Sequence, residues 1–230
     1  MKKRKRWMTA GLVALVLISG CLAWFYGLRE EAQLDPNQVL EEPLQNMAAA
    51  KSFKYRLEST ISVDNRREVI SRIQGERNSS GSTHIKGEMV KTPVDIYHID
   101  RTTYNWDDSS KKWLVISDIN SNTSNVLIAE LDPLSNFNFK SISQVEKVGF
   151  EKVGNRKCIT IKCAPSVENE LMEVALKDFR YKLWIDYKDK LIRKATLSAV
   201  SKNNPDARLN MKVEFDDYNR EITIKKPDLN

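Results

Sequence analysis

The side chains that could carry catalysis are few, and their spacing fits none of the common catalytic sites. The two histidines, His84 and His98, do not form an H-E-x-x-H pair, and no cysteines have C-x-x-C spacing. The sequence also lacks a G-x-S-x-G elbow and a G-x-x-x-x-G-K phosphate loop. Ser109 and Lys112 match the S-x-x-K string, but they lie in a polar turn between two predicted strands. We therefore expect a protein that is not an enzyme and holds no metal or cofactor.

Acidic residues gather at predicted hairpin turns, where they could bind a cation. They are Asp100, Asp107, Asp108 and the pair Asp216 and Asp217. Aspartate is common at such positions because its side chain hydrogen-bonds the backbone of the turn. We interpret these residues as turn formers.

Cys158 and Cys163 flank a predicted strand and face opposite sides of it. Five residues of strand separate them by roughly 17 Å, whereas a disulfide needs Cα atoms within about 7 Å. We expect two half-buried free thiols, with dimerisation through either one as the alternative.

The aromatic residues are the candidates for ligand binding. One interpretation is that they build the core between a sheet and its helices, since aromatic rings bury large apolar areas. The other is that some of them line a concave apolar pocket, as at the mouths of partly closed barrels. The candidates for such a groove are Tyr97, Tyr104, Trp106, Trp113, Phe137 and Trp184.

Most of the chain beyond residue 52 alternates between apolar and polar side chains, which is typical of strands with one buried face. Strands are predicted at 53–63, 69–73, 83–89, 94–99, 102–106, 112–116, 145–153, 156–163, 179–187, 191–200 and 209–215. Asp35 and Pro36 begin a helix that Pro43 interrupts. A short helix or a loop lid is predicted at 126–131, and a further helical piece at 168–178. The predicted fold is mainly β (α+β): a strongly curved antiparallel sheet or incomplete β-barrel with a broken N-terminal helix and short helices covering the concave side.

The charge of the chain is concentrated at its N-terminus. The formal net charge is +6, yet residues 29–230 carry 32 basic against 31 acidic side chains, because five basic residues occupy positions 2–6. A nucleic-acid-binding domain usually carries its basic excess on the folded body. We therefore expect no nucleic-acid partner.

Residues 8–28 contain no charged side chain, and as a helix they would span roughly 30 Å, the thickness of a bilayer core. One interpretation is a cytoplasmic tail at 1–7, a transmembrane signal-anchor at 8–28, a tether at 29–35 and an exported domain at 36–230. The other is a lipoprotein signal peptide, because Ile18-Ser19-Gly20-Cys21 resembles a lipobox and Cys21 would then be lipidated. Both place the main domain outside the cytoplasmic membrane and attached to it.

Two phrases, LDPLSNF at 131–137 and YKLWIDYKDKLIRKATL at 181–197, follow a leading helix and serial strands. This order resembles the LolA-like superfamily over roughly residues 36–227. That group includes periplasmic lipoprotein carriers, LppX-type lipid-binding lipoproteins and sensor domains related to the anti-sigma regulator RseB. The resemblance implies a half-barrel with a hydrophobic concave face.

Two functions follow from this resemblance. The first is a membrane-tethered module that binds a lipid or acyl chain in an apolar groove, for envelope lipid or lipoprotein handling. The second is a regulatory protein that contacts an envelope partner, as RseB-type domains and the clostridial germination lipoprotein GerS do. The near-neutral body favours recognition by shape and apolar contact over long-range charge attraction.

Overall fold

The computed structural model describes residues 35–64, 66–117 and 133–229. Of these, residues 35–39 belong to one unit, and the residues from 40 onward belong to a second, compact unit. The predicted cytoplasmic tail, transmembrane segment, Cys21, tether up to residue 34 and helix or loop lid at 126–131 lie outside the described residues. Within the described ranges, no helix combines the length and apolarity needed to cross a bilayer.

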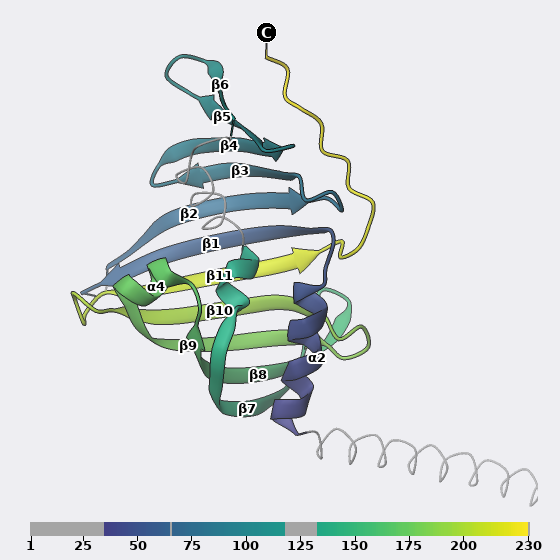
Figure 1. The fold of residues 1–230 in the computed structure, drawn as a ribbon. Helices are drawn as coiled ribbons and strands as arrows, with labels where there is room; N and C mark the ends of the chain where they lie inside the picture. The colour runs from purple at the N-terminus through teal and green to yellow at the C-terminus, as the bar shows by residue number, and fades with distance from the viewer. Residues whose placement is uncertain (1–34, 65, 118–132, 230) are drawn as a thin grey trace, which may run out of the picture. The chain divides into compact units, whose positions relative to one another are not determined.

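Eleven strands and three helical segments make up the described chain (Figure 1). The helical segments are α2 (Pro36–Ala48), η1 (Pro133–Phe137) and α4 (Glu170–Ala175). The strands are β1 (Phe53–Val63), β2 (Arg66–Arg77), β3 (Thr83–Met89), β4 (Thr92–Ile99), β5 (Thr102–Asp107), β6 (Lys112–Ser117), β7 (Phe139–Val153), β8 (Arg156–Val167), β9 (Leu176–Asp186), β10 (Ile192–Ser201) and β11 (Arg208–Asp216).

All the strands belong to one antiparallel sheet, in the order β6-β5-β4-β3-β2-β1-β11-β10-β9-β8-β7. Strands that follow each other in sequence pair with one another, except for β6 and β7, and β1 pairs with β11, which joins the two halves of the chain at the centre of the sheet. β6 and β7 are the two edges, and the sheet is not closed into a barrel. The predicted fold class, a curved antiparallel sheet with few helices, is confirmed.

The alternating pattern gives the sheet two different faces. In β1, Phe53, Tyr55 and Leu57 are buried, whereas Lys54 and Arg56 are exposed. Cross-strand pairing extends each set across the sheet, because residues directly opposite share a face. We call the first set and its partners the apolar face; it includes Ile73, Ile85, Ile96, Ile161, Tyr181, Leu183, Leu197, Val213 and Phe215. The opposite side, which carries Lys54, Arg56 and Glu58, is the charged face.

Within the second unit, η1, α4 and residues 40–48 of α2 cover the apolar face in front of β7–β11 (Figure 1). Within the second unit, Leu40 and Met47 of α2 are each 2% exposed, and Asn46 Nδ2 donates to the Lys190 carbonyl oxygen at 3.0 Å. Full burial of such side chains contributes about 1.5–3 kcal/mol each. This packing anchors the helix over the sheet.

The prediction that Pro43 breaks the N-terminal helix was wrong. A single helix runs through Pro43 from Pro36 to Ala48. Proline inside a helix costs roughly 3 kcal/mol, because it removes one hydrogen bond and crowds the preceding turn. Burial of Pro43 and of its neighbours Leu40 and Met47 offsets that cost.

The helix predicted at 168–178 is shorter than expected. The α4 helix begins after its N-cap Asn169, whose side chain accepts from the Met172 backbone N–H at 3.1 Å, and it ends at Ala175. Leu176 then pairs with Ser201 as the first residue of β9. The helical pattern in the sequence continues to residue 178, but the helix ends at Ala175 because the residues that follow pair with a distant strand.

Candidate functional site

The residues predicted to line one groove lie on both faces of the sheet. Cross-strand pairs place Tyr97 opposite Tyr104 and Trp106 opposite Trp113, and Tyr97 also pairs with His84 on the charged face. The rings of Tyr97 and Trp113 lie 5.6 Å apart, and those of Trp106 and Trp113 lie 5.3 Å apart. Tyr97, Trp106 and Trp113 therefore form a cluster on the charged face of β4–β6, and Tyr104 lies on the same face.

Trp184 lies on the charged face as well, at the other half of the sheet. It pairs with Lys194, and its Nε1 donates to a Glu151 carboxylate oxygen at 2.7 Å. The ammonium groups of Lys182 and Lys194 lie 4.5 Å and 4.3 Å from its ring. Cation–π contacts of this kind help to fix the position of the indole.

Phe137 is the member of the predicted set that reaches the apolar face. It is the last residue of η1, and its ring lies 5.9 Å from Phe215 and 6.0 Å from Tyr181, edge to face in both cases. Tyr181 Oη donates to the Asn136 carbonyl oxygen at 2.7 Å. Burial raises the pKa of Tyr181, so its hydroxyl stays protonated and remains a donor. This contact fixes η1 on the apolar face.

Replacing Tyr181 with phenylalanine tests this attachment. We expect the free energy of unfolding to fall by about 1–3 kcal/mol, because the Asn136 carbonyl loses its buried donor. Urea unfolding measures the change, and faster proteolysis within residues 133–138 would locate it. Tyr187→Phe is the matched control, because the Tyr187 side chain is only partly buried. Loss of its hydroxyl should therefore change the free energy of unfolding less. Equal effects of the two substitutions would contradict the assignment.

Two glycines leave part of the apolar face without side chains. Gly75 of β2 pairs with Tyr55 and Ile85, and Gly87 of β3 pairs with Ile73 and Val94. The Tyr55 ring lies over Gly75, where an added Cβ would come within 2.3 Å of it. At Gly87 an added Cβ would lie 2.1 Å from the Arg72 carbonyl oxygen. Glycine inside a strand is the sequence signal from which such a close approach could be predicted.

A hollow of about 760 Å³ lies between α4 and the adjoining ends of β8 and β9. Its apolar lining residues are Ala164, Pro165, Val167, Val174, Leu176 and Phe179. Val167 and Phe179 are buried, whereas Val174 is 78% exposed. Phe179 lies two residues before Tyr181 on the same strand and face, so the hollow adjoins the cluster around Phe137.

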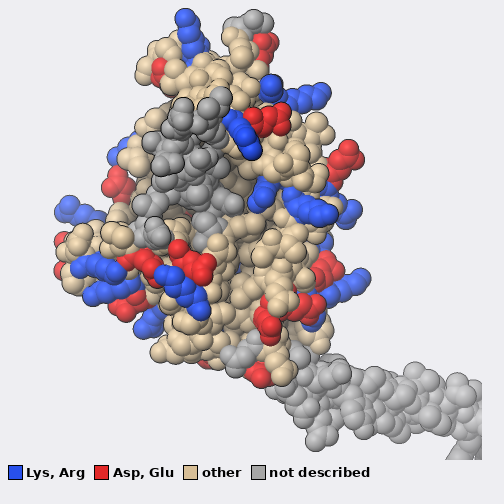
Figure 2. All heavy atoms as spheres, viewed as in Figure 1, with Lys and Arg blue, Asp and Glu red and all other residues tan. Residues whose placement is uncertain are grey.

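Charged side chains surround the mouth of this hollow. Glu173, Lys177, Asp178 and Lys202 line it with the apolar residues, and Figure 2 shows charges of both signs where Figure 1 places α4. Lys202 Nζ donates to the Glu173 carbonyl oxygen, and Lys140 forms an ion pair with the Glu173 carboxylate at 2.7 Å. The site therefore has an apolar interior and a polar rim. Neither Val174 nor Lys202 was singled out in the sequence, because nothing local links positions so far apart in the chain.

The hollows on the charged face have a different character. One of about 570 Å³ and one of about 430 Å³ share Arg56, Gln74 and Lys86 as lining residues. Ion pairs cross them, including Arg56 with Glu214 and Asp216 at 3.3 Å each. Such a surface is solvated and does not suit an apolar ligand.

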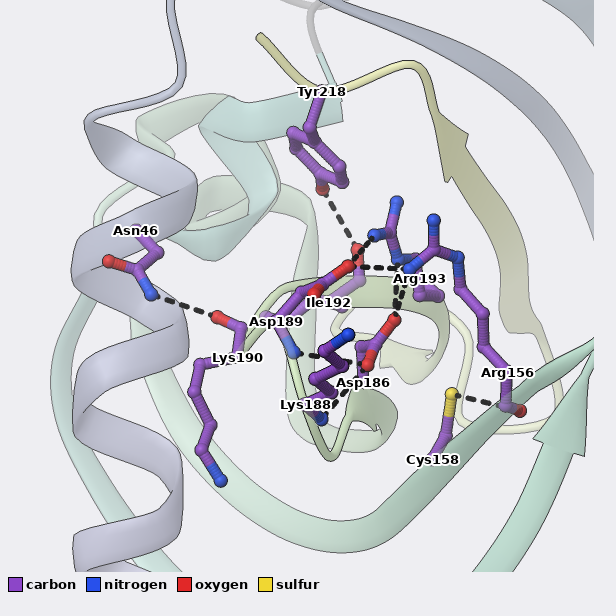
Figure 3. A network of polar contacts seen from close by, with 10 residues as sticks. All are labelled: Asn46, Arg156, Cys158, Asp186, Lys188, Asp189, Lys190, Ile192, Arg193 and Tyr218. Atoms are coloured by element: carbon purple, nitrogen blue, oxygen red, sulfur yellow. Dashed lines mark hydrogen bonds and ion pairs between the residues drawn. The ribbon is translucent and has the colours of Figure 1, made fainter.

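A network of polar contacts closes the β9–β10 hairpin beside α2 (Figure 3). Asp186 Oδ2 accepts from Arg156 at 2.8 Å and from Arg193 at 3.3 Å, while its Oδ1 accepts from the backbone N–H of Lys188 and Asp189. Burial raises the pKa of Asp186, but these donors outweigh burial and lower the pKa overall. The carboxylate is thus held ionised as an anchor for the hairpin.

The cysteines and histidines of the described part of the chain are all buried or in contact with other side chains. Cys158 and Cys163 are free as predicted, but they are buried rather than half-buried, and burial raises the pKa of the Cys163 thiol to about 12. His84 stacks on Tyr97 and contacts Asp95 at 2.9 Å, while His98 contacts Thr103 at 3.2 Å. Among the described residues, no group of His, Cys, Asp and Glu is arranged to hold a metal ion.

Comparison with solved structures shows which proteins share this fold. Lipoprotein LppX of Mycobacterium tuberculosis matches with a TM-score of 0.57 and 13% identity, over 84% of this chain and 100% of LppX. LprF of Mycobacterium bovis matches with a TM-score of 0.50 and 10% identity, over 84% and 96%. A LolA superfamily protein of Nitrosomonas europaea has a TM-score of 0.36 and 10% identity, over 83% and 96%. No family model and no curated protein matches the sequence. The fold predicted from the resemblance to LppX-type lipoproteins is confirmed.

Proposed function

We propose that this LolA-like chain is a non-enzymatic module that binds a lipid or acyl chain on the apolar face. The ligand enters through the hollow beside α4. The observation that carries the proposal is an apolar hollow of about 760 Å³ that adjoins the buried aromatic cluster. Ligand sites for small molecules commonly have volumes of about 300–1,000 Å³ and are lined by apolar side chains with a few polar groups.

The rim of the hollow suits an amphiphile. Lys177 and Lys202 supply cations beside the apolar residues, and an anionic head group could interact with them while the chain contacts Val174 and Phe179. Phe137 lies deeper on the same face. The proposal therefore retains Phe137 from the predicted groove residues and adds the lining of the hollow, whereas the other predicted aromatics lie on the charged face.

The fold supports this proposal without identifying the ligand. LppX, which shares this fold, is a lipoprotein, and a resemblance to LppX-type proteins is consistent with lipid binding. Because one fold can serve several functions, the hollow and not the similarity is the main support for lipid binding.

We also propose that the module works outside the cytoplasmic membrane and is attached to it by residues 8–28 or by a lipid on Cys21. The support is the uncharged run, its basic N-terminal flank and the lipobox-like string. The intact mass of the chain from membrane fractions distinguishes the two anchors: an unprocessed Met1 indicates the transmembrane segment, and a lipid adduct on Cys21 indicates the lipoprotein. A soluble chain without either would contradict the attachment.

Replacing Val174 with aspartate tests the ligand site. Val174 is 78% exposed, so the substitution should leave the free energy of unfolding nearly unchanged, while a carboxylate in the hollow disfavours an acyl chain. We expect native mass spectrometry of the purified full chain to show lipid adducts, and their occupancy to fall about tenfold in the variant.

Val90→Asp is the matched control, because Val90 is 69% exposed and lies in the turn between β3 and β4. We expect this variant to retain the lipid. A wild-type chain without lipid adducts, or equal occupancy in both variants, would argue against the proposed site.

A further inference from the structure

The two edge strands of the sheet differ in how they are protected against pairing with other chains. An edge strand presents unpaired N–H and C=O groups, so edges usually carry bulges or charges that prevent a further strand from adding. In the described chain, β6 pairs with β5 and β7 pairs with β8. Each therefore has one side without a strand partner among the described residues.

β7 has both kinds of protection. Its register against β8 shifts at three places, between residues 139 and 141, 143 and 146, and 147 and 149. Gln144 has a positive φ of 52°, which bends the strand further. Charged side chains recur along it at Lys140, Glu146, Lys147, Glu151 and Lys152. This edge is irregular and charged, so it resists strand addition.

β6 has neither. Its sequence, KWLVIS, contains no charge after Lys112 and no proline or glycine, and its six residues pair with β5 without a register shift. Leu114, Val115 and Ile116 are 48%, 50% and 38% exposed. Because successive strand residues face opposite sides, apolar surface is exposed on both faces of this edge. Regular, apolar, uncharged edges of this kind favour pairing with another strand.

We propose that β6 is a homodimerisation edge, where a second copy of this chain adds its own β6 in antiparallel orientation about a two-fold axis. The sheet then continues from one copy into the other. This inference does not depend on the proposed lipid binding, because the hollow beside α4 lies at the other half of the sheet.

The register of such a pair follows from the alternation of faces. Residues directly opposite in an antiparallel pair share a face, so the two-fold axis must pass through a residue rather than between two. An axis at Val115 places Val115 opposite itself, Leu114 opposite Ile116 and Trp113 opposite Ser117. The three exposed apolar residues then contact one another, whereas an axis at Leu114 would place Lys112 opposite Ile116.

The charges near β6 are compatible with a second copy. In the register centred on Val115, residues 113–117 of the two copies meet, and none of them is charged. The adjoining turn carries Asp107 and Asp108 together with Lys111 and Lys112, so the two turns bring no excess of like charge. In this register the apolar residues of one β6 lie opposite apolar residues of the other. We therefore assign this edge to a second copy of the same chain.

Replacing Val115 with lysine tests the proposal. In the dimer the two new ammonium groups would lie directly opposite each other, which destabilises strand pairing. We expect sedimentation velocity of the full wild-type chain to show a concentration-dependent dimer, and Val115→Lys to raise its dissociation constant at least about tenfold. Val148→Lys is the matched control, because Val148 is 43% exposed on the protected edge β7.

Cysteine substitutions test the register independently. Val115→Cys should give a disulfide-linked dimer, because directly opposite residues have Cα atoms about 4.5–5.5 Å apart, within disulfide range. Leu114→Cys, which lies opposite Ile116, should cross-link more slowly, and any cross-link through Cys21 is common to both variants. A wild-type chain that stays monomeric at every concentration, or a dimer that Val115→Lys and Val148→Lys affect equally, overturns the proposal.

Discussion

Replacing Asp186 with asparagine is expected to lower the free energy of unfolding by about 3–5 kcal/mol, the cost of removing one partner from a buried ion pair. Asp186 is 3% exposed and Arg193 is 6% exposed. An asparagine has nearly the same shape but no negative charge, so the buried Arg193 guanidinium would keep only the more exposed Asp189 carboxylate as a counter-charge. Urea denaturation of both proteins measures the difference.

The effect should extend beyond the hairpin, because other elements attach to the same turn. Asn46 of α2 donates to the Lys190 carbonyl oxygen at 3.0 Å, and Tyr218 Oη donates to the Ile192 carbonyl oxygen at 2.9 Å (Figure 3). A turn that loses its anchor loosens both contacts. We therefore expect faster amide hydrogen exchange in residues 40–48 as well as in β9 and β10.

Asp189→Asn is the control for this prediction. Asp189 contacts the same arginines, Arg156 and Arg193, but its side chain is 37% exposed. Ion pairs exposed to solvent contribute about 0–1 kcal/mol, so this variant should be far less destabilised. If the two substitutions lower the free energy of unfolding equally, the buried network does not stabilise the fold in the way that its geometry indicates.

The pH dependence of the difference follows from the lowered pKa of Asp186. A carboxyl group whose pKa is lower in the folded state stabilises that state above its unfolded pKa of about 3.9. This contribution is lost as the pH falls through the folded pKa. The wild-type advantage over Asp186→Asn should thus be constant at neutral pH and shrink below about pH 4, which urea denaturation in acidic buffers can measure.

Replacing Gly87 with alanine is expected to be the most damaging small substitution in the strands. Gly87 has a φ of +151°, and an added Cβ would lie 2.1 Å from the Arg72 carbonyl oxygen and 2.8 Å from the Ile73 Cα. Backbone strain accounts for about 1–3 kcal/mol, and the steric clash adds about 1–3 kcal/mol, since backbone atoms cannot move aside as a side-chain end can.

Gly149→Ala is the control that separates the steric clash at Gly87 from the backbone strain that a positive φ imposes on alanine. Gly149 has a similar φ of +146°, but an added Cβ would meet nothing within 4 Å. The difference between the two variants in the free energy of unfolding then measures the close approach of β2 and β3. We expect Gly87→Ala to be the more destabilised, with accelerated hydrogen exchange in β2 and β3. Equal costs would mean that the two strands can separate without penalty.

The elements could be predicted from the sequence because their signals are local. Alternation with a period of two identifies a strand wherever one face is buried, and turn residues mark its ends. The strand predicted at 83–89 coincides with β3, and the one at 209–215 lies within β11. The predictions at Pro43 and at 168–178 failed where distant contacts outweighed local preference: α2 is buried against the sheet, and Leu176 is drawn into β9.

The candidate site could not be assembled in the same way. β4 has apolar or aromatic residues on both of its faces, for example Ile96 and Tyr97. The alternation along this strand therefore does not show which face is directed toward the core. Pairing with β3 decides this, placing Ile96 with Ile85 on the apolar face and Tyr97 with His84 on the charged face. The hollow beside α4 likewise joins Val174 and Lys202, which are distant in the sequence.

The sequence by itself determined that this chain is a serial antiparallel sheet without a recognisable catalytic motif, with its excess positive charge confined to positions 2–6. Only the tertiary structure decided which aromatics share a face, where the apolar hollow lies and which carboxylate anchors the β9–β10 hairpin. The physical reason is the range of the interactions. Strand period and turn chemistry act between neighbouring residues, whereas faces, hollows and buried ion pairs arise when distant strands pair.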